Sequence, residues 1–188
     1  MTFQPRSLNS IFYSIFRGVE QRNLALSWIR KRIKREPGHG IVYFMDDDNS
    51  YSVELFEEMS KIRRGAVGIW AVGLVGGLKV EKPLVEDDQV IGFNSAWHPE
   101  RPFPIDMAGF AISCDLLEKN PDGQFSYEVK KGYQESKILQ QFTTRDKLQP
   151  LGVNKILVWH TRTEPPKLDD ELKLAKKNLP ASDDGMFV

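Results

Sequence analysis

Three consecutive carboxylates follow a run of β-branched and aromatic residues. The run, residues 41–45 (IVYFM), has the composition of a buried strand, and Asp46, Asp47 and Asp48 come directly after it. In open α/β sheets, ligands bind beyond the carboxyl ends of strands. A hard cation such as Mg²⁺ or Mn²⁺ relieves the repulsion between neighbouring carboxylates, and a diphosphate is a natural partner for that cation. The triplet therefore predicts a metal-assisted site for a nucleotide sugar or a phosphoryl group.

Two other interpretations of the aspartates are open at this point. One is a solvated surface loop. The other is a Ca²⁺ loop, whose ligand positions one, three, five and twelve would be Asp46, Asp48, Ser50 and Glu57. Position six of that loop requires glycine but is Tyr51, and the segment before it has the pattern of a strand rather than a helix. We therefore favour the metal-assisted site.

A second predicted strand ends in residues suited to phosphate. Residues 156–159 (ILVW) predict the strand, and His160 and Arg162 follow it. The guanidinium of an arginine offers a planar fork that matches phosphate oxygens. The alternative is a loop histidine bonded to backbone and an arginine in a surface ion pair. Beside a strand that ends in carboxylates, the two interpretations are balanced.

Other candidates stand in less distinctive surroundings. Glu135 begins a predicted helix, where a carboxylate serves either as a general base or as a partner of the helix dipole, and the sequence pattern favours the second. Trp97, Arg101 and Asp106 lie in a proline-rich segment, where an aromatic face and charged groups suit a sugar. A tryptophan that anchors the core is an equally common explanation.

A mixed α/β fold has to position these residues. The hydrophobic pattern predicts helices at 18–35, 54–64 and 133–142, and strands at 41–45, 67–75, 78–80, 107–114 and 156–159. We expect the first helix to pack through Leu24, Trp28 and Ile33. Residues 76–77 predict a turn and residues 81–105 a loop. The charged tail from Pro165 onward is expected to contribute little core.

Length and composition narrow the possibilities. A chain of 188 residues predicts one domain with a real core. Lys and Arg together number 26, as do Asp and Glu, so no net field attracts nucleic acid. Cys114 is the single cysteine, which excludes an intrachain disulfide. The longest apolar stretch, 66–78, is too short for a membrane span of about 20 residues. We find no visible anchor or signal sequence.

Taken together, these segments resemble the β-1,3-glucuronosyltransferases, Golgi enzymes that transfer glucuronic acid from UDP-glucuronate to a terminal galactose. The matching stretches occur in order and are RGVEQRNLAL (17–26), VYFMDDDNSYSVELFEEM (42–59), VGLVGGLKVE (72–81), AWHPERPFPIDMAGFA (96–111), GYQES (132–136) and ILVWHTRTEPP (156–166). The resemblance implies a GT-A-type nucleotide-sugar transferase domain with a mixed sheet, acting by a single inverting displacement.

The resemblance also implies roles for individual residues. Asp48 would hold Mn²⁺, and Glu135 would be the catalytic base, which replaces the helix-dipole interpretation. The implied donor contacts are Arg17, Arg22, Asp46, Asp47, His160 and Arg162. The implied acceptor contacts are Glu81, Trp97, Arg101 and Asp106.

The resemblance further implies partners and a location. The donor would be UDP-glucuronate, and the acceptor a galactose-terminated glycan of a proteoglycan or glycoprotein. Within the family, the enzyme type that completes the proteoglycan linker tetrasaccharide matches best. The type that builds the HNK-1 epitope on N-acetyllactosamine-type glycans is the alternative. A homodimer on the lumenal side of the Golgi membrane is expected.

The family pattern begins at about Arg17, which divides the chain into an unmatched segment, 1–16, and a partial catalytic domain, 17–188. The first βαβ portion of the family's domain has no counterpart here. We therefore expect an uncovered sheet edge, low stability and slow transfer. The alternative to an enzyme is an inactive fragment that persists as a binding or dimer-forming module.

Overall fold

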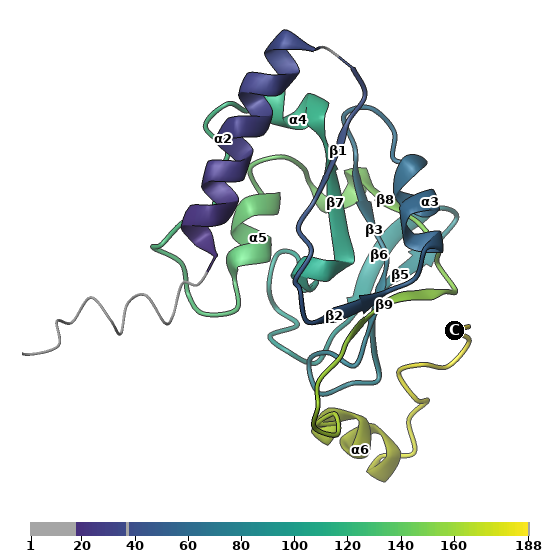
Figure 1. The fold of residues 1–188 in the computed structure, drawn as a ribbon. Coiled ribbons are helices and arrows are strands. Elements are labelled where there is room, and N and C mark those ends of the chain that lie inside the picture. Colours follow the sequence, from purple (N-terminus) through teal and green to yellow (C-terminus); the bar gives the residue numbers. More distant parts are fainter. Residues whose placement is uncertain (1–17, 37, 188) are drawn as a thin grey trace, which may run out of the picture.

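The computed structural model describes residues 18–36 and 38–187, which form helices packed on two mixed sheets (Figure 1). The helices are α2 (Val19–Arg35), α3 (Glu54–Ser60), α4 (Cys114–Lys119), α5 (Gln134–Leu139) and α6 (Asp169–Lys176). The strands are β1 (Ile41–Tyr43), β2 (Asn49–Tyr51), β3 (Val67–Ile69), β4 (Ala71–Gly73), β5 (Val80–Glu86), β6 (Gln89–Asn94), β7 (Phe110–Ser113), β8 (Leu148–Pro150) and β9 (Ile156–His160). Two short 3₁₀ turns are η1 (Met107–Gly109) and η2 (Arg145–Lys147). The predicted mixed α/β class is confirmed.

The strand order brings distant segments of the chain together. One sheet has the order β1-β7-β3-β8 and the other β2-β9-β4-β5-β6. The pairs β3–β8 and β4–β9 are parallel, and the other pairs of these sheets are antiparallel. In the β2–β9 pair, Asn49 lies opposite His160. The aspartates that precede β2 are therefore placed beside the end of β9.

Trp70 is fully buried where the chain crosses from β3 in one sheet to β4 in the other. Its indole Nε1 donates to the carbonyl oxygen of Ala108 at 2.8 Å. The hydroxyl of Tyr43, at the end of β1, donates to the same oxygen at 2.9 Å. The two rings lie edge to face, with centroids 5.5 Å apart. This pair of bonds fixes the turn η1, which follows Asp106.

The helices cover opposite faces of the first sheet. Figure 1 shows α2, α4 and α5 on one side of β7 and β3, and α3 on the other. One core cluster accordingly contains residues of α2, α4 and α5, including Leu26, Leu117 and Ile138. Another contains Leu55 and Met59 of α3. None of the helices in the described ranges combines the length and the apolar character needed to cross a bilayer.

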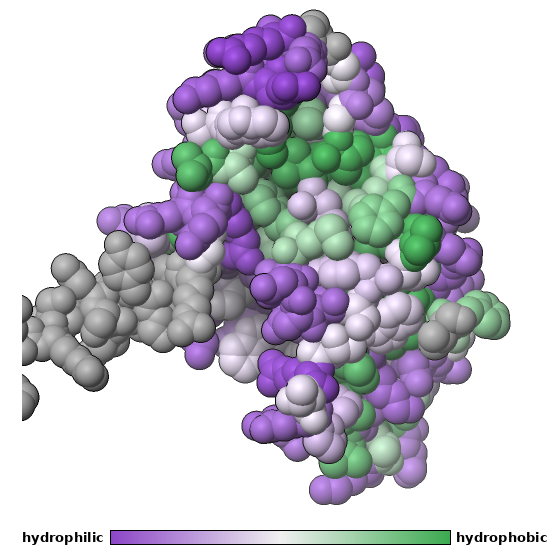
Figure 2. All heavy atoms as spheres, viewed as in Figure 1, coloured by the Kyte–Doolittle hydropathy of each residue, from purple (hydrophilic) through white to green (hydrophobic). Residues whose placement is uncertain are grey.

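The limits of α2 confirm the first predicted helix, but the predicted packing face is wrong. Val19 and Leu26 are buried, whereas Leu24 is 73% and Trp28 63% exposed. Ile33 does pack against the core as expected. The helix is apolar on more than one side, so its periodicity does not identify the side that meets α4. Figure 2 shows a green band of apolar residues across the region of α2 and β1.

The predicted loop at 81–105 is partly wrong, because β5 and β6 form a hairpin there. Its turn is made by Asp87 and Asp88, which both have positive φ. Prolines in this segment argue against a strand, yet Pro83 lies within β5. Strand β4 pairs with β5 only at Val80 and Glu81, so β5 has a single neighbour at Pro83. A strand position with one neighbour tolerates the missing N–H.

Several other boundaries differ from the predicted ones. The strand expected at 67–75 is two strands, β3 and β4, in different sheets, and the strand expected at 107–114 begins as the turn η1. The predicted strand at 41–45 ends at Tyr43 and lies at the edge of its sheet. Both helices expected at 54–64 and 133–142 end earlier. The sequence analysis predicted no helix or strand at the positions of α4, α6, β2 and β8.

The charged tail is tied down by polar contacts. The single buried residue of α6 is Glu171, which confirms the expectation of little apolar core. Its carboxylate accepts hydrogen bonds from the backbone N–H of Lys79 at 3.1 Å and of Ser182 at 3.0 Å, and from the Ser182 hydroxyl. The tail thereby holds the residue before β5, two residues from Glu81.

Candidate active site

The aspartate triplet forms a turn between β1 and β2 whose backbone is held by two hydroxyls. Tyr51 donates to the carbonyl oxygen of Asp46, and Thr161 donates to that of Asp48, both at 2.8 Å. The Asp46 side chain contacts Arg22 at 3.3 Å, while Asp48 is exposed. The backbone bonds leave the Asp48 carboxylate free to meet a ligand.

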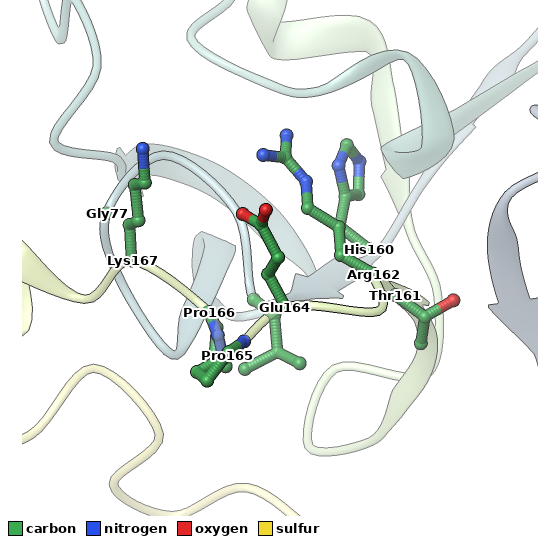
Figure 3. A pocket seen from close by; sticks show the side chains of 9 residues that line it. Gly77, His160, Thr161, Arg162, Glu164, Pro165, Pro166 and Lys167 are labelled. Carbon is green, nitrogen blue, oxygen red and sulfur yellow. The ribbon is translucent and has the colours of Figure 1, made fainter.

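Two open cavities adjoin the end of β9. One, of about 310 Å³, is lined by His160, Arg162, Glu164 and Lys167 among others (Figure 3). The other, of about 660 Å³, is lined by Asp48, Thr161, Arg162, Thr163 and Glu164. Arg162 and Glu164 line both cavities. The fold therefore brings together the two predicted strand ends, one carrying carboxylates and the other cations.

The residues at this end fit a metal that arrives with a nucleotide. Within the described part of the chain, no three His, Cys, Asp or Glu side chains gather into a ready-made metal cage. Mg²⁺ and Mn²⁺ in nucleotide sites are bound by one or two carboxylates, with phosphate oxygens and waters completing the shell. Asp48, exposed beside a cavity that also contains Arg162, matches that arrangement. The EF-hand alternative does not, because Ser50 lies in β2 and bonds Thr161.

Glu135, at the start of α5, is a largely buried carboxylate. Its side chain is 16% exposed, and Oε2 accepts no hydrogen bond from the described residues. Burial raises the pKa of Glu135 to about 7, and the charge of Asp106 adds to the rise. The Arg101 guanidinium, 3.9 Å away, opposes it. A carboxylate with this proton affinity is suited to general acid–base chemistry near neutral pH.

Glu81 is a second buried carboxylate in the same region. Ser95 donates to its Oε1 at 2.6 Å, and burial raises the pKa of Glu81 to about 7. Gly76 has φ +64°, and a Cβ at that position would lie 2.4 Å from Glu81 Oε1. The Gly76-Gly77 turn is therefore required for this carboxylate to occupy its position.

Asp106 lies between the predicted donor and acceptor residues. His160 Nε2 is 2.9 Å from Asp106 Oδ1. Burial works to lower the pKa of His160, but the hydrogen bond and charge of Asp106, together with the charges of Asp46 and Asp48, outweigh it and raise the pKa. The protonated form of the imidazole is consequently favoured beside the aspartate turn.

Arg101 and Trp97 border the carboxylates. Arg101 is 3% exposed and donates to the carbonyl oxygens of His98 at 3.2 Å and Gly132 at 2.9 Å. Trp97 is 48% exposed, and a Cβ at Gly132 would lie 2.6 Å from its indole Nε1. An accessible indole next to the segment that leads into α5 favours the sugar-binding interpretation of Trp97 over the core-anchoring one.

The structure brings together most of the predicted site residues. Arg22 contacts Asp46 and lies over the Phe125 ring at 5.6 Å. Asp47 is exposed and makes no hydrogen bond or ion pair within the described ranges. Arg17, and the predicted segment 1–16 with it, lies outside the described residues.

The sequence analysis did not predict the positioning roles of two residues. Thr161 bonds Asp48, and Trp70 fixes Ala108. Thr161 lies between His160 and Arg162 in the sequence, and this position could have indicated that Thr161 belongs to the site. Trp70 occurs in a buried strand pattern, which gives no hint that its N–H reaches Ala108, 38 residues away.

Substituting Glu135 with glutamine is expected to stabilise the chain relative to wild type as pH rises. The pKa of Glu135 is about 7 in the folded chain against an ordinary 4.5, so the folded state keeps a proton that the unfolded state has released. The free energy of unfolding of the wild-type chain therefore falls as pH rises from 4.5 to about 7. Above pH 7 the loss reaches ~3 kcal/mol. Glutamine carries no such penalty. Urea unfolding at pH 5 and pH 8 measures the difference.

The exposed Glu128 provides a matched control, and Glu128→Gln should keep the wild-type pH dependence. An equal change in unfolding free energy between the two pH values for wild type and Glu135→Gln would contradict this prediction.

Comparison with known proteins places this geometry in a family context. Residues 3–164 match glycosyltransferase family 43. The galactosylgalactosylxylosylprotein 3-beta-glucuronosyltransferase I of Drosophila melanogaster is 64% identical over 176 residues, covering 92% of this chain and 57% of that protein. The human galactosylgalactosylxylosylprotein 3-beta-glucuronosyltransferase 3 is 48% identical over 172 residues, covering 86% of this chain and 51% of that protein.

A third relative is similar to this chain to nearly the same degree as the human protein. The galactosylgalactosylxylosylprotein 3-beta-glucuronosyltransferase 2 of Rattus norvegicus is 47% identical over 161 residues, covering 84% of this chain and 49% of that protein. The chain thus spans about half the length of the curated relatives it matches.

Proposed function

We propose, from the premise that the chain belongs to glycosyltransferase family 43, that it transfers glucuronic acid from UDP-glucuronate to the 3-hydroxyl of a terminal galactose. The proposal rests on one observation: the site contains both groups suited to binding a diphosphate and, apart from them, a carboxylate suited to act as a base. Asp48, His160 and Arg162 surround cavities suited to a diphosphate. Glu135, with a pKa of about 7, is the base-like carboxylate of the site.

The transfer is a single inverting displacement. Glu135 accepts the proton of the acceptor hydroxyl as that oxygen bonds to the anomeric carbon of the glucuronate. The bond from that carbon to the diphosphate breaks, and UDP leaves with the electron pair. Because the Glu135 pKa lies near neutrality, its ionised form is both populated and basic enough to take the proton.

The donor side stabilises the charge that develops on the leaving diphosphate. Arg162 and His160, whose protonated form Asp106 favours, supply positive groups of the chain itself. Arg22, paired with Asp46, and the neighbouring Asp47 complete the proposed donor contacts. Mn²⁺, held by Asp48 when bound, would neutralise part of the diphosphate charge.

The acceptor side consists of groups that suit a hexose. The exposed indole of Trp97 offers a stacking face, and Glu81, Arg101 and Asp106 offer partners for hydroxyls. We extend the proposal to the linker glycan of proteoglycans as acceptor, because the relatives are named for a galactosylgalactosylxylosylprotein. The homodimer and the lumenal Golgi location expected from the resemblance belong to the same proposal.

The test is transfer of labelled glucuronate by the purified 188-residue chain to a galactosyl-β1,3-galactose acceptor in the presence of Mn²⁺. We expect a product linked to the 3-hydroxyl, at whatever rate the chain sustains, and none with UDP-glucose as donor. UDP binding without any product would overturn the proposal and support the binding-module alternative.

A further inference from the structure

Asp106 contacts the donor side of the site, although its resemblance-based role is on the acceptor side. His160 closes β9 next to the aspartate turn, and its Nε2 lies 2.9 Å from Asp106 Oδ1. The two side chains are only 24% and 19% exposed. A carboxylate can only accept, so the ring N–H donates to it. In a partly buried setting, such a charge-assisted bond is stronger than a neutral one.

The Asp106 carboxylate is itself fixed in place. Its Oδ1 also accepts from the backbone N–H of Ala108 at 2.9 Å, which caps the turn η1. The Ala108 carbonyl oxygen in turn receives the Trp70 indole N–H and the Tyr43 hydroxyl. Trp70 is fully buried. The carboxylate therefore projects from a rigid support that joins both sheets, rather than from a mobile loop.

The bond to Asp106 also determines which nitrogen of His160 can meet an anion. Nε2–H is committed to Asp106, so Nδ1 is the ring nitrogen left to meet a ligand, and it donates when the ring is protonated. His160 lines the cavity that Arg162 and Lys167 share (Figure 3). The orientation of the ring toward that cavity thus depends on Asp106.

We propose that Asp106 is a positioning residue for His160, orienting the imidazole so that Nδ1–H binds the diphosphate of the donor. The inference rests on the proposed function and deepens it. A residue that only bound the acceptor would have no effect on UDP affinity measured without acceptor. A residue that positions His160 must affect that affinity.

The experiment is a double-mutant cycle on UDP affinity, measured by calorimetry with Mn²⁺ and no acceptor. Asp106→Asn keeps an acceptor for the Ala108 N–H but removes the charge, and we expect it to weaken UDP binding about tenfold. His160→Gln should cost a similar factor, and the double variant should lose little more, because the two residues act as one unit.

Asp122→Asn is the matched control, because it is the same substitution at an exposed position outside the proposed site. We expect its UDP affinity to stay within about twofold of wild type, a change of less than 0.5 kcal/mol. Thermal unfolding of each variant identifies losses caused by misfolding. The ¹⁵N resonance of His160 Nε2 should shift in Asp106→Asn even without UDP, an effect that a purely structural role elsewhere would not produce.

The outcomes separate this inference from the proposed function. UDP binding that requires Asp48 but is unchanged in Asp106→Asn overturns the positioning role alone. Fully additive losses in the double variant, or an unshifted His160 resonance, overturn it as well. A wild-type chain that binds no UDP at all overturns the proposed function, and the positioning role with it.

Discussion

Replacing Glu135 with glutamine is expected to slow glucuronate transfer by about 10²–10⁴-fold, the range that a positioned general base contributes. The Glu135 carboxylate is largely buried, with a pKa of about 7, and its Oε2 accepts no hydrogen bond from the described residues. Glutamine reproduces its shape but cannot accept the hydroxyl proton. The proposed diphosphate contacts at His160 and Arg162 are unaltered, so UDP affinity should not change. Single-turnover transfer and calorimetry measure the two quantities separately.

The control for this experiment is Glu128→Gln, an identical change at an exposed position that precedes α5. It should transfer at the wild-type rate. Transfer by Glu135→Gln within about tenfold of wild type would contradict the assignment of the base. A parallel loss of UDP affinity would instead indicate that Glu135 helps to hold the donor.

The strand ends on the donor side could be predicted because their signals are local. A run of β-branched and aromatic residues ends at the aspartates, and a second ends at His160. The structure confirms strands at Ile41–Tyr43 and Ile156–His160. That the two ends meet depends on the β2–β9 pairing, and β2 is three residues with no distinct pattern. The resemblance, rather than the pattern, placed these ends in one site.

Contacts between distant segments could not be predicted from sequence. Asp106 and His160 are 54 residues apart, and the resemblance placed them on opposite sides of the reaction. Local pattern also favoured a helix-dipole role for Glu135. Its raised pKa comes from burial in the folded chain and from the charge of Asp106, which no local pattern contains.

The packing face of α2 illustrates the same limit in the core. Leu24 and Trp28 are large and apolar, and their spacing suits one face of a helix. The helix instead buries Leu26, and its Arg30 donates to carbonyl oxygens of the α4 segment, including those of Leu117 and Asn120. These hydrogen bonds from a long side chain fix the rotation of the helix about its axis. The spacing of hydrophobic residues contains no information about such bonds.

Asp48→Asn is expected to abolish Mn²⁺-dependent UDP binding, lowering affinity by about 100-fold or more, because a bound cation contributes several kcal/mol at a phosphate. The Asp48 side chain is exposed next to the cavity of Arg162 and Glu164. Its backbone carbonyl, which accepts from Thr161, is kept in the variant. The change therefore removes one charge without disturbing the turn. Calorimetric titration of UDP with Mn²⁺, and again after chelation, measures the loss.

Glu57→Gln is the decisive control, because Glu57 is the twelfth position of the alternative Ca²⁺ loop and lies in α3, away from the cavities. The metal-assisted site predicts wild-type UDP binding in this variant. The Ca²⁺ loop predicts tight Ca²⁺ binding without nucleotide, lost in Glu57→Gln. Because β2 occupies the middle of that segment and its Ser50 hydroxyl bonds Thr161, the oxygens of a Ca²⁺ loop cannot converge without dismantling the β2–β9 pair. Wild-type UDP affinity in Asp48→Asn would contradict the metal assignment, because this substitution removes the carboxylate beside the cavity and keeps the backbone bond to Thr161.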